Sequence, residues 1–102
     1  MTTKASAENK AYVVFFTKEG CSPCERMKQQ TLSDPEVVTL LNEKLLLYEA
    51  EYPAFEAIEL SGKFEVKAFP TLLVFGPKGV KIGEMIGGQS ATSLVTFFSK
   101  RA

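Results

Sequence analysis

Two cysteines separated by two residues are the feature that most constrains this chain. The segment Cys21-Ser22-Pro23-Cys24 contains the only cysteines of the sequence. Residues 11–16 before it are apolar and rich in β-branched and aromatic side chains, as in a buried strand. Residues 25–30 after it are mostly good helix formers. The pair is therefore predicted to lie where a strand is followed by a helix, with Cys21 at or just before the first helical turn.

This placement favours a reactive thiolate at Cys21. Backbone N–H groups are unpaired in the first turn of a helix, and the positive end of the helix dipole lies there. A CxxC segment lowers the pKa of its nucleophilic thiol from about 8.5 to roughly 3.5–7.5. The residues therefore predict a centre for dithiol–disulfide exchange. Its redox group would be the Cys21–Cys24 disulfide, and we expect no further cofactor.

Other uses of the two cysteines fit the sequence less well. A structural disulfide closing so small a loop would remove little entropy from the unfolded chain. A zinc site usually needs four ligands, and the chain has two cysteines and no histidine. Two thiolates could hold Cu(I), but nothing else in the sequence indicates copper transport. A cysteine peptidase normally pairs its nucleophile with a histidine.

Length and composition predict one domain with a substantial core. The chain has 102 residues, of which 45% are hydrophobic. Its 12 basic and 12 acidic residues offer no electrostatic reason to bind nucleic acid, and no polybasic segment marks a membrane surface. The apolar runs are far too short to span a membrane. We expect a monomer.

The first ten residues are expected to form a short lead-in to a domain at 11–102. Residues 1–10 are polar and lack the apolar region of a secretory signal. This predicts a cytoplasmic protein, in which a transient, catalytic disulfide is expected rather than a permanent one. An excised mature domain with an added Met would look the same, so a periplasmic location is the alternative.

The first half of the chain predicts a strand, two helical segments and a second strand. The strand covers about 11–17, and the helix after Cys24 should falter at residues 31–33. Ser33 with Glu36 fits a capping box, and Asp34 before Pro35 fits an N-cap, so a helix is predicted at about 35–43. Its inward side chains are expected to be Val37, Val38, Leu40 and Leu41.

The strand at 45–51 begins with three leucines, which suits a central position in a parallel sheet. A helix should then run from Pro53 to about Gly62, where glycine is a plausible stop. Its inward side chains are expected to be Phe55, Ile58 and Leu60.

The remaining residues predict a hairpin and a closing helix. Strands are expected at 71–75 and 80–86, joined by a turn at 76–79. A helix at about 91–101 follows, with Ser90 or Thr92 near its cap. Its apolar side is expected to carry Leu94, Val95, Phe97 and Phe98. The predicted order is β-α-β-α-β-β-α, an α/β fold with a mixed four-stranded sheet and helices on both faces. A right-handed crossover would put the loop with the cysteines at a carboxyl edge of the sheet, where α/β sites form.

A second motif lies at Phe69-Pro70-Thr71, directly before the strand at 71–75. A proline in this position could mark a cis peptide bond in a tight turn. Together with the CxxC, it makes the chain resemble the thioredoxin superfamily. The hairpin turn at Pro77-Lys78-Gly79 and Gly87 before the last helix also match. The resemblance covers about residues 11–101 and implies a thioredoxin-like fold.

The resemblance also implies roles for individual residues. Cys21 would be the exposed attacking cysteine and Cys24 the buried resolving one. Pro70 would be cis and lie beside the cysteines, with backbone groups of Phe69 available to a bound substrate. The implied partners are protein disulfides or dithiols and an upstream thiol reductase. The expected substrate-binding positions are Gly20, Ser22, Pro23, Phe69, Pro70 and Gly87.

The chain departs from thioredoxin in three places. Gly20 and Ser22 replace the Trp and the Gly of the family's Trp-Cys-Gly-Pro-Cys segment. Phe15 occupies the position of a buried Asp that would assist deprotonation of the resolving thiol. Glu49 on the neighbouring strand is a candidate for that role, but we expect it to be a solvated strand end. Residues 31–37 are more similar to disulfide-interchange domains of bacterial envelope proteins.

These features predict a thiol-disulfide oxidoreductase that acts as a reductant or interchange protein. A histidine between the cysteines would stabilise the thiolate and suit an oxidant, and this chain has none there. Two alternatives remain open at this point. One is a glutaredoxin-like enzyme that uses glutathione or bridges an iron–sulfur cluster between two chains. The other is a non-enzymatic module that uses the thioredoxin fold for binding.

Overall fold

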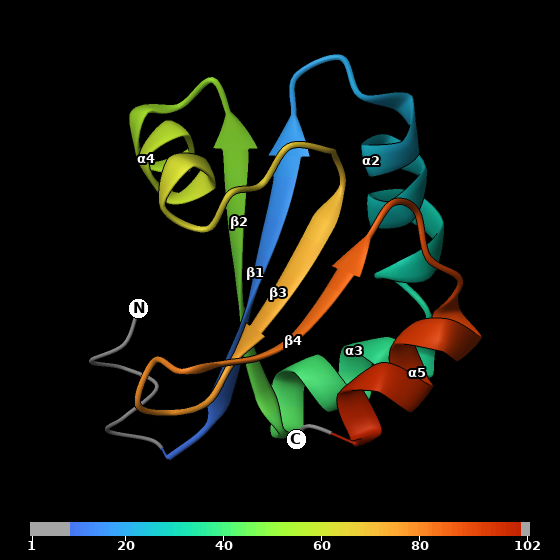
Figure 1. The fold of residues 1–102 in the computed structure, drawn as a ribbon. Helices are drawn as coiled ribbons and strands as arrows, with labels where there is room; N and C mark the ends of the chain where they lie inside the picture. Colours follow the sequence, from blue (N-terminus) through green and yellow to red (C-terminus); the bar gives the residue numbers. More distant parts are fainter. Residues whose placement is uncertain (1–8, 101–102) are drawn as a thin grey trace.

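A mixed four-stranded sheet forms the centre of the part of the chain that the structure, a computed structural model, describes, residues 9–100 (Figure 1). The strand order is β2-β1-β3-β4. β1 is parallel to β2 and antiparallel to β3, and β3 pairs antiparallel with β4. The predicted sheet is therefore confirmed. The strands are β1 (Ala11–Lys18), β2 (Leu45–Tyr52), β3 (Thr71–Phe75) and β4 (Lys81–Ile86).

Helices cover both faces of the sheet, as predicted (Figure 1). One face carries α4, and the other carries the first helical region, residues 22–31, together with α3 and α5. The predicted element order is confirmed. Residues 1–8 of the expected lead-in and residue 101 of the expected last helix lie outside the described residues. The helical elements are α2 (Ser22–Arg26), the π-helix η1 (Met27–Thr31), α3 (Pro35–Glu43), α4 (Phe55–Lys63) and α5 (Ala91–Ser99).

β1 is apolar on both faces because it lies between β2 and β3 and is covered from both sides. Successive side chains of a strand point to opposite faces. Val13 and Phe15 accordingly pack into a core with α3 and α5. Val14 and Phe16 pack into a second core under α4. An uninterrupted apolar run is the pattern that such a doubly covered strand requires.

The central position predicted for the second strand is wrong, because β2 lies at an edge of the sheet. It has a hydrogen-bonded neighbour on the β1 side only. Leu45 is fully buried, but Leu47 is 40% exposed. The run of leucines therefore reflects contacts near the start of the strand rather than burial along its whole length.

The start of α3 follows the predicted proline signal but not the predicted capping box. Asp34 is the N-cap, and its carboxylate accepts a hydrogen bond from the Glu36 N–H at 3.0 Å. The Ser33 hydroxyl donates instead to carbonyl groups of the preceding helix, so Ser33 closes that helix and does not cap α3. The expected burial of Val37 is confirmed, and Leu40 and Leu41 pack partly buried against the same core. The expected burial of Val38 is wrong, because Val38 is exposed.

The inward face predicted for α4 is also wrong in two places. Phe55 and Ile58 are exposed, and the residue of α4 that is buried in the core with the sheet is Ala57. Small side chains let a helix approach a sheet whose own aromatic residues fill the space between them. The helix begins at Phe55 rather than Pro53, and it continues through Gly62 to Lys63. Glu65, with a φ of 56°, follows the helix end.

The last third of the chain agrees with the prediction. Residues 76–79 form the turn between β3 and β4, where the Gly76 N–H donates to the Val80 carbonyl at 2.8 Å. Ser90 is the N-cap of α5, and its hydroxyl accepts from the Ser93 N–H. Leu94 and Phe98 are buried in the core with α3. Val95 and Phe97 pack against the same core partly buried.

We expect the Phe98→Ala variant to unfold much more easily than the wild type. Phe98 is fully buried, so truncation removes apolar contacts and leaves a cavity, which typically costs about 3–5 kcal/mol. Phe55→Ala is the matched control because Phe55 is 75% exposed, and its effect should stay within about 0.5 kcal/mol. Urea unfolding followed by circular dichroism gives both values. Equal losses in the two variants would contradict this description of the core.

Candidate functional site: a disulfide at the edge of the sheet

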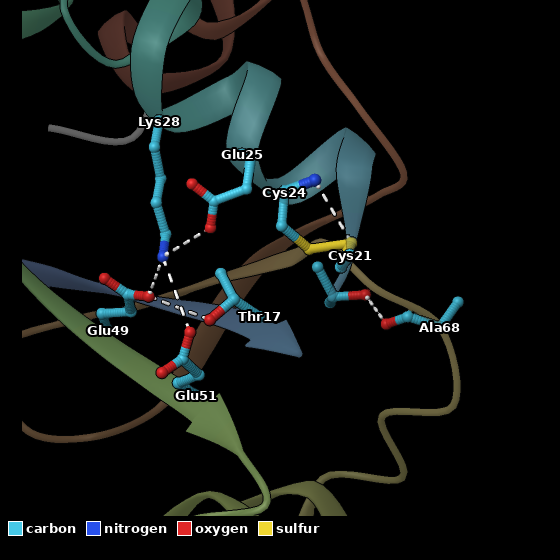
Figure 2. The surroundings of a disulfide bond; sticks show 9 residues. Thr17, Cys21, Cys24, Glu25, Lys28, Glu49, Glu51 and Ala68 are labelled. Carbon is cyan, nitrogen blue, oxygen red and sulfur yellow. Dashed lines mark hydrogen bonds and ion pairs between the residues drawn. A yellow bond between two sulfur atoms is a disulfide. The ribbon is translucent and has the colours of Figure 1, made fainter. Parts of the chain in front are cut away.

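Cys21 and Cys24 form a disulfide where β1 is followed by α2 (Figure 2). Cys21 is the N-cap of α2, and its Sγ accepts a hydrogen bond from the Cys24 N–H at 3.2 Å. Gly20 has a φ of +79°, which suits a residue without a Cβ in the turn leaving the strand. The Cys21 N–H donates to the Lys18 carbonyl at 3.1 Å, and this bond closes the turn.

The two sulfur-bearing residues differ in exposure. Cys24 is 1% exposed and faces the sheet, whereas Cys21 is partly exposed at the start of the helix. Ser22 and Pro23 between them are exposed. A partner molecule can therefore reach the Cys21 side of the disulfide, while the protein covers Cys24.

A second loop, the one that precedes β3, lies beside the disulfide. The Phe69–Pro70 peptide bond is cis, as the resemblance implied, and Pro70 is buried. Thr71 pairs with Phe16 near the end of β1, and its hydroxyl donates to the Ala68 carbonyl at 2.8 Å. Figure 2 shows Ala68 in the surroundings of the disulfide.

A third loop joins the second through a backbone hydrogen bond. The Gly87 N–H donates to the Pro70 carbonyl at 2.8 Å, and Gly87 has a φ of +89°. The last residues of β1 and β4 and the first residues of β3 lie at the same end of the sheet (Figure 1). Antiparallel pairing of β3 with both neighbours thus brings together three segments that are far apart in the sequence. These segments contain all six expected substrate-binding positions.

Phe69 is partly buried against an aromatic neighbour that the sequence did not indicate. Its ring centroid lies 6.1 Å from that of Tyr52, at the end of β2. Tyr52 is itself followed by a cis bond to Pro53. The ring contact fixes one side of the Phe69–Pro70 loop against the end of β2. Only the packing of the Phe69–Pro70 loop against the end of β2 reveals this pair, because the two residues are far apart in the sequence.

A shallow hollow lies between the first helical region and the loop before α5. It has a volume of about 370 Å³ and a largely polar lining. The Thr31 hydroxyl donates to the Gln89 carbonyl at 2.7 Å and links its two walls. Of its lining residues, Pro23 was expected near a substrate, while Arg26 and Gln89 were not. The lining consists of Pro23, Arg26, Met27, Gln30, Thr31, Gly88, Gln89 and Ser90.

A charged cluster, formed by Glu25, Lys28, Glu49 and Glu51, lies under the first helical region (Figure 2). The Lys28 Nζ is 2.7 Å from Glu49 Oε2, 3.6 Å from Glu25 and 3.8 Å from Glu51. The hydrogen bond to Glu49 raises the pKa of Lys28, and the charges of the three carboxylates raise it further, against an opposing effect of burial. The i, i+3 spacing of Glu25 and Lys28 is a local signal for part of this cluster.

The position that holds an acid in thioredoxin is apolar here. Phe15 is 1% exposed and packs in the core with α3 and α5. Glu49 lies opposite Phe15 on β2, and it accepts a hydrogen bond from the buried Thr17 hydroxyl at 2.9 Å. Its side chain is 40% exposed, as expected for a strand end, but it is held by Thr17 and Lys28 rather than free in solvent.

Within residues 9–100, no group of three or more potential ligands is placed to hold a metal ion. In the same described range, no helix has the length and apolar character needed to cross a bilayer.

The chain belongs to the thioredoxin-like domain family, whose sequence profile matches residues 1–102. The predicted resemblance to the thioredoxin superfamily is thus confirmed, and so is the thioredoxin-like fold. Comparison with the curated proteins found no match.

Solved structures show the same fold. A thioredoxin from Thermus thermophilus is 24% identical, with a TM-score of 0.87 over 97% of this chain and 78% of that one. A protein described as DsbH oxidoreductase is 23% identical, with a TM-score of 0.80 over 99% of this chain and 80% of its own. The reduced DsbD C-terminal domain of Neisseria meningitidis is 18% identical, with a TM-score of 0.80 over 99% of this chain and 90% of that domain.

The raised pKa of Lys28 predicts how its contribution to stability depends on pH. A raised folded-state pKa adds stability that is fully present below the unfolded value, here 10.5, and is lost as pH rises through the folded value. The difference in unfolding free energy between wild type and Lys28→Met should therefore be constant from about pH 7 to about pH 10 and shrink above pH 10. Urea unfolding at several pH values measures it. A difference that grows with alkaline pH would contradict the assignment, and Lys81→Met controls for loss of a surface lysine.

Proposed function

We propose that this protein is a thiol-disulfide oxidoreductase that reduces or exchanges protein disulfides through Cys21 and Cys24. The observation that carries the proposal is the unequal exposure of one disulfide: Cys21 is reachable at a helix start, and Cys24 is 1% exposed behind it. A purely structural disulfide in so short a loop would stabilise the fold little. Membership of the thioredoxin-like domain family supports the same function.

The reaction begins with the reduced protein. The Cys21 thiolate attacks one sulfur of a partner's disulfide, and the other partner sulfur leaves as a thiolate and takes up a proton. The product is a mixed disulfide between Cys21 and the partner. Cys24 then loses its proton and attacks Cys21 Sγ, which breaks the mixed disulfide. The partner leaves with two thiols, and the Cys21–Cys24 disulfide carries the oxidation.

The site supplies two features that assist these steps. The Cys24 N–H points at Cys21 Sγ, at 3.2 Å, and the same hydrogen bond would stabilise negative charge on that sulfur. The short loop holds Cys24 next to Cys21, so the second attack is intramolecular and needs no encounter between molecules.

The rim around Cys21 provides the proposed contact surface for a partner. Phe69 would offer backbone groups to an extended segment that carries the partner's disulfide, in the manner of strand addition. Gly20 and Gly87 leave this surface free of side chains. Ser22 and Pro23 lie exposed between the cysteines, and the buried Pro70 follows Phe69 in its loop.

We assign the protein to the reducing or interchange side of this chemistry. No histidine lies between the cysteines to stabilise the thiolate and make the dithiol a strong oxidant. Its partners would be protein disulfides or dithiols and an upstream thiol reductase, which it would meet as a monomer. A reductant fits the cytoplasm, and an interchange protein fits the periplasm.

The direct test is reduction of oxidised insulin in the presence of dithiothreitol. The wild type should accelerate precipitation of the insulin B chain, because Cys21 attacks the insulin disulfides. Cys21→Ser should return the rate to that of dithiothreitol alone. Wild-type protein that gives no acceleration over the Cys21→Ser variant would refute the proposed activity.

Removing the resolving cysteine should trap partners instead of releasing them. Cys24→Ser leaves Cys21 able to form a mixed disulfide, but no thiol remains within the site to break it. We therefore expect covalent complexes on non-reducing gels after exposure to an extract, identified by mass spectrometry after reduction. The double variant Cys21→Ser, Cys24→Ser is the control. Normal turnover by Cys24→Ser would show that a second cysteine is not needed.

A further inference from the structure

The shallow hollow between the first helical region and the loop before α5 includes a residue of the disulfide loop in its lining. That residue is Pro23, which stands between the two cysteines and is exposed. On the loop side the lining includes Gly88, directly after Gly87, whose N–H donates to the Pro70 carbonyl at 2.8 Å. The hollow is therefore continuous with the rim around Cys21 to which we assign partner binding.

Hydrogen bonds hold the two walls of the hollow together. The Thr31 hydroxyl on the helical wall donates to the Gln89 carbonyl on the loop wall at 2.7 Å. The Gln89 side-chain amide donates to the carbonyls of Ile86 and Gly87, at 3.3 and 3.4 Å, and so keeps the loop folded on itself. The Ser90 hydroxyl caps α5. These polar side chains build the hollow and are already engaged in hydrogen bonds.

Two other side chains of the helical wall supply donors for a ligand. Arg26 and Gln30 are four residues apart, both line the hollow, and both are exposed. Within residues 9–100, no carboxylate forms an ion pair with Arg26. Its neighbour Glu25 is turned toward Lys28, 3.6 Å away (Figure 2). A guanidinium without a carboxylate partner can bind one through two parallel hydrogen bonds, and a glutamine amide adds further donors.

Charge and size indicate what kind of group the hollow fits. Its lining contains one cation, Arg26, and no acidic residue, so a negative group complements it. Its volume of about 370 Å³ is near the lower end of the roughly 300–1,000 Å³ of ligand pockets. A shallow space of this size suits one or two side chains of a bound segment rather than a large separate ligand.

We propose that the hollow binds the carboxylate of an acidic residue near the reactive cysteine of a protein partner, so that Cys21 reacts preferentially with acidic segments. This inference rests on the proposed thiol exchange at Cys21. Arg26 would determine the specificity, with Gln30 as a second donor. The carboxylate takes no part in the exchange of sulfur bonds. It raises the rate because it holds the partner's sulfur within reach of Cys21.

Short peptides whose cysteine is activated as a mixed disulfide with 2-thiopyridine test this preference. In the Cys24→Ser variant, the Cys21 thiolate bonds to the peptide sulfur and the bond from that sulfur to thiopyridine breaks. Thiopyridine leaves with the electron pair, takes up a proton and is followed by its absorbance. One peptide carries aspartates before its cysteine, another carries them after it, and matched peptides carry asparagines. The ratio of the rate constants, aspartate over asparagine, measures the preference.

The ratio should be about three for at least one placement of the aspartates, as for an exposed ion pair. Added to the same background, Arg26→Gln should lower it to about one, and Arg26→Glu should invert it. High salt should reduce the ratio, because salt screens exposed charges. Lys78→Gln is the matched control: Lys78 is also exposed but lies in the turn after β3, at the opposite end of the sheet (Figure 1). It should leave the ratio unchanged.

A ratio near one for both placements, or a ratio that survives Arg26→Glu, would overturn the proposal. A dependence on Arg26 seen only with activated glutathione would also overturn it, because the hollow would then serve a small thiol.

The peptide measurement is separate from the test of the proposed function, since it needs Cys21 as a nucleophile but neither Cys24 nor turnover. If the wild type failed to reduce insulin while acidic peptides were preferred, the proposed function would fail and the role of the hollow would stand. If insulin were reduced and no preference appeared, the reverse would hold.

Discussion

The burial of β1 on both faces is the constraint on which the rest of this structure depends. Val13 and Phe15 hold the helices of one face, while Val14 and Phe16 hold α4 on the other. Neither helical layer could be removed without exposing one side of the central strand. The strand therefore has a fixed position, and this also fixes the position of the residues that follow it. Cys21 lies at the end of the sheet where β1 terminates because the strand before it cannot move.

The difference between the two cysteines follows from the same arrangement. The helical region of α2 and η1 packs through Met27 against the face of the sheet that carries Phe15, and Cys24 is buried while the N-cap Cys21 is partly exposed. Cys24 lies on the covered side and Cys21 at the open start. The disulfide thus joins Cys21, which solvent can reach, to Cys24, which the protein buries. In a thiol-exchange reaction this difference would separate the attacking sulfur from the resolving one.

The chemistry beneath the helix differs from what thioredoxin would lead one to expect. The position that holds a buried acid in that family is Phe15, which contributes to the core. Charge enters instead from the edge strand, where Glu49 meets Lys28 and Thr17. A carboxylate on an edge strand remains partly exposed, as the 40% exposed side chain of Glu49 is here.

Local patterns in the chain were sufficient to predict the elements, the disulfide-bearing segment and the family. Strand periodicity, the CxxC and the Phe69-Pro70-Thr71 turn are all read within a few residues, and each is dominated by backbone preference or burial. The same patterns failed for Phe55, Ile58 and Val38, and they misplaced β2. Whether an apolar residue is buried depends on which elements pack against it. Strand order likewise depends on the pairing of all strands in the sheet. The contacts between Lys28, Glu49 and Thr17, and between Gly87 and Pro70, arise for the same reason: they join residues far apart in the chain that only the packing of helix, loops and sheet brings within hydrogen-bond reach.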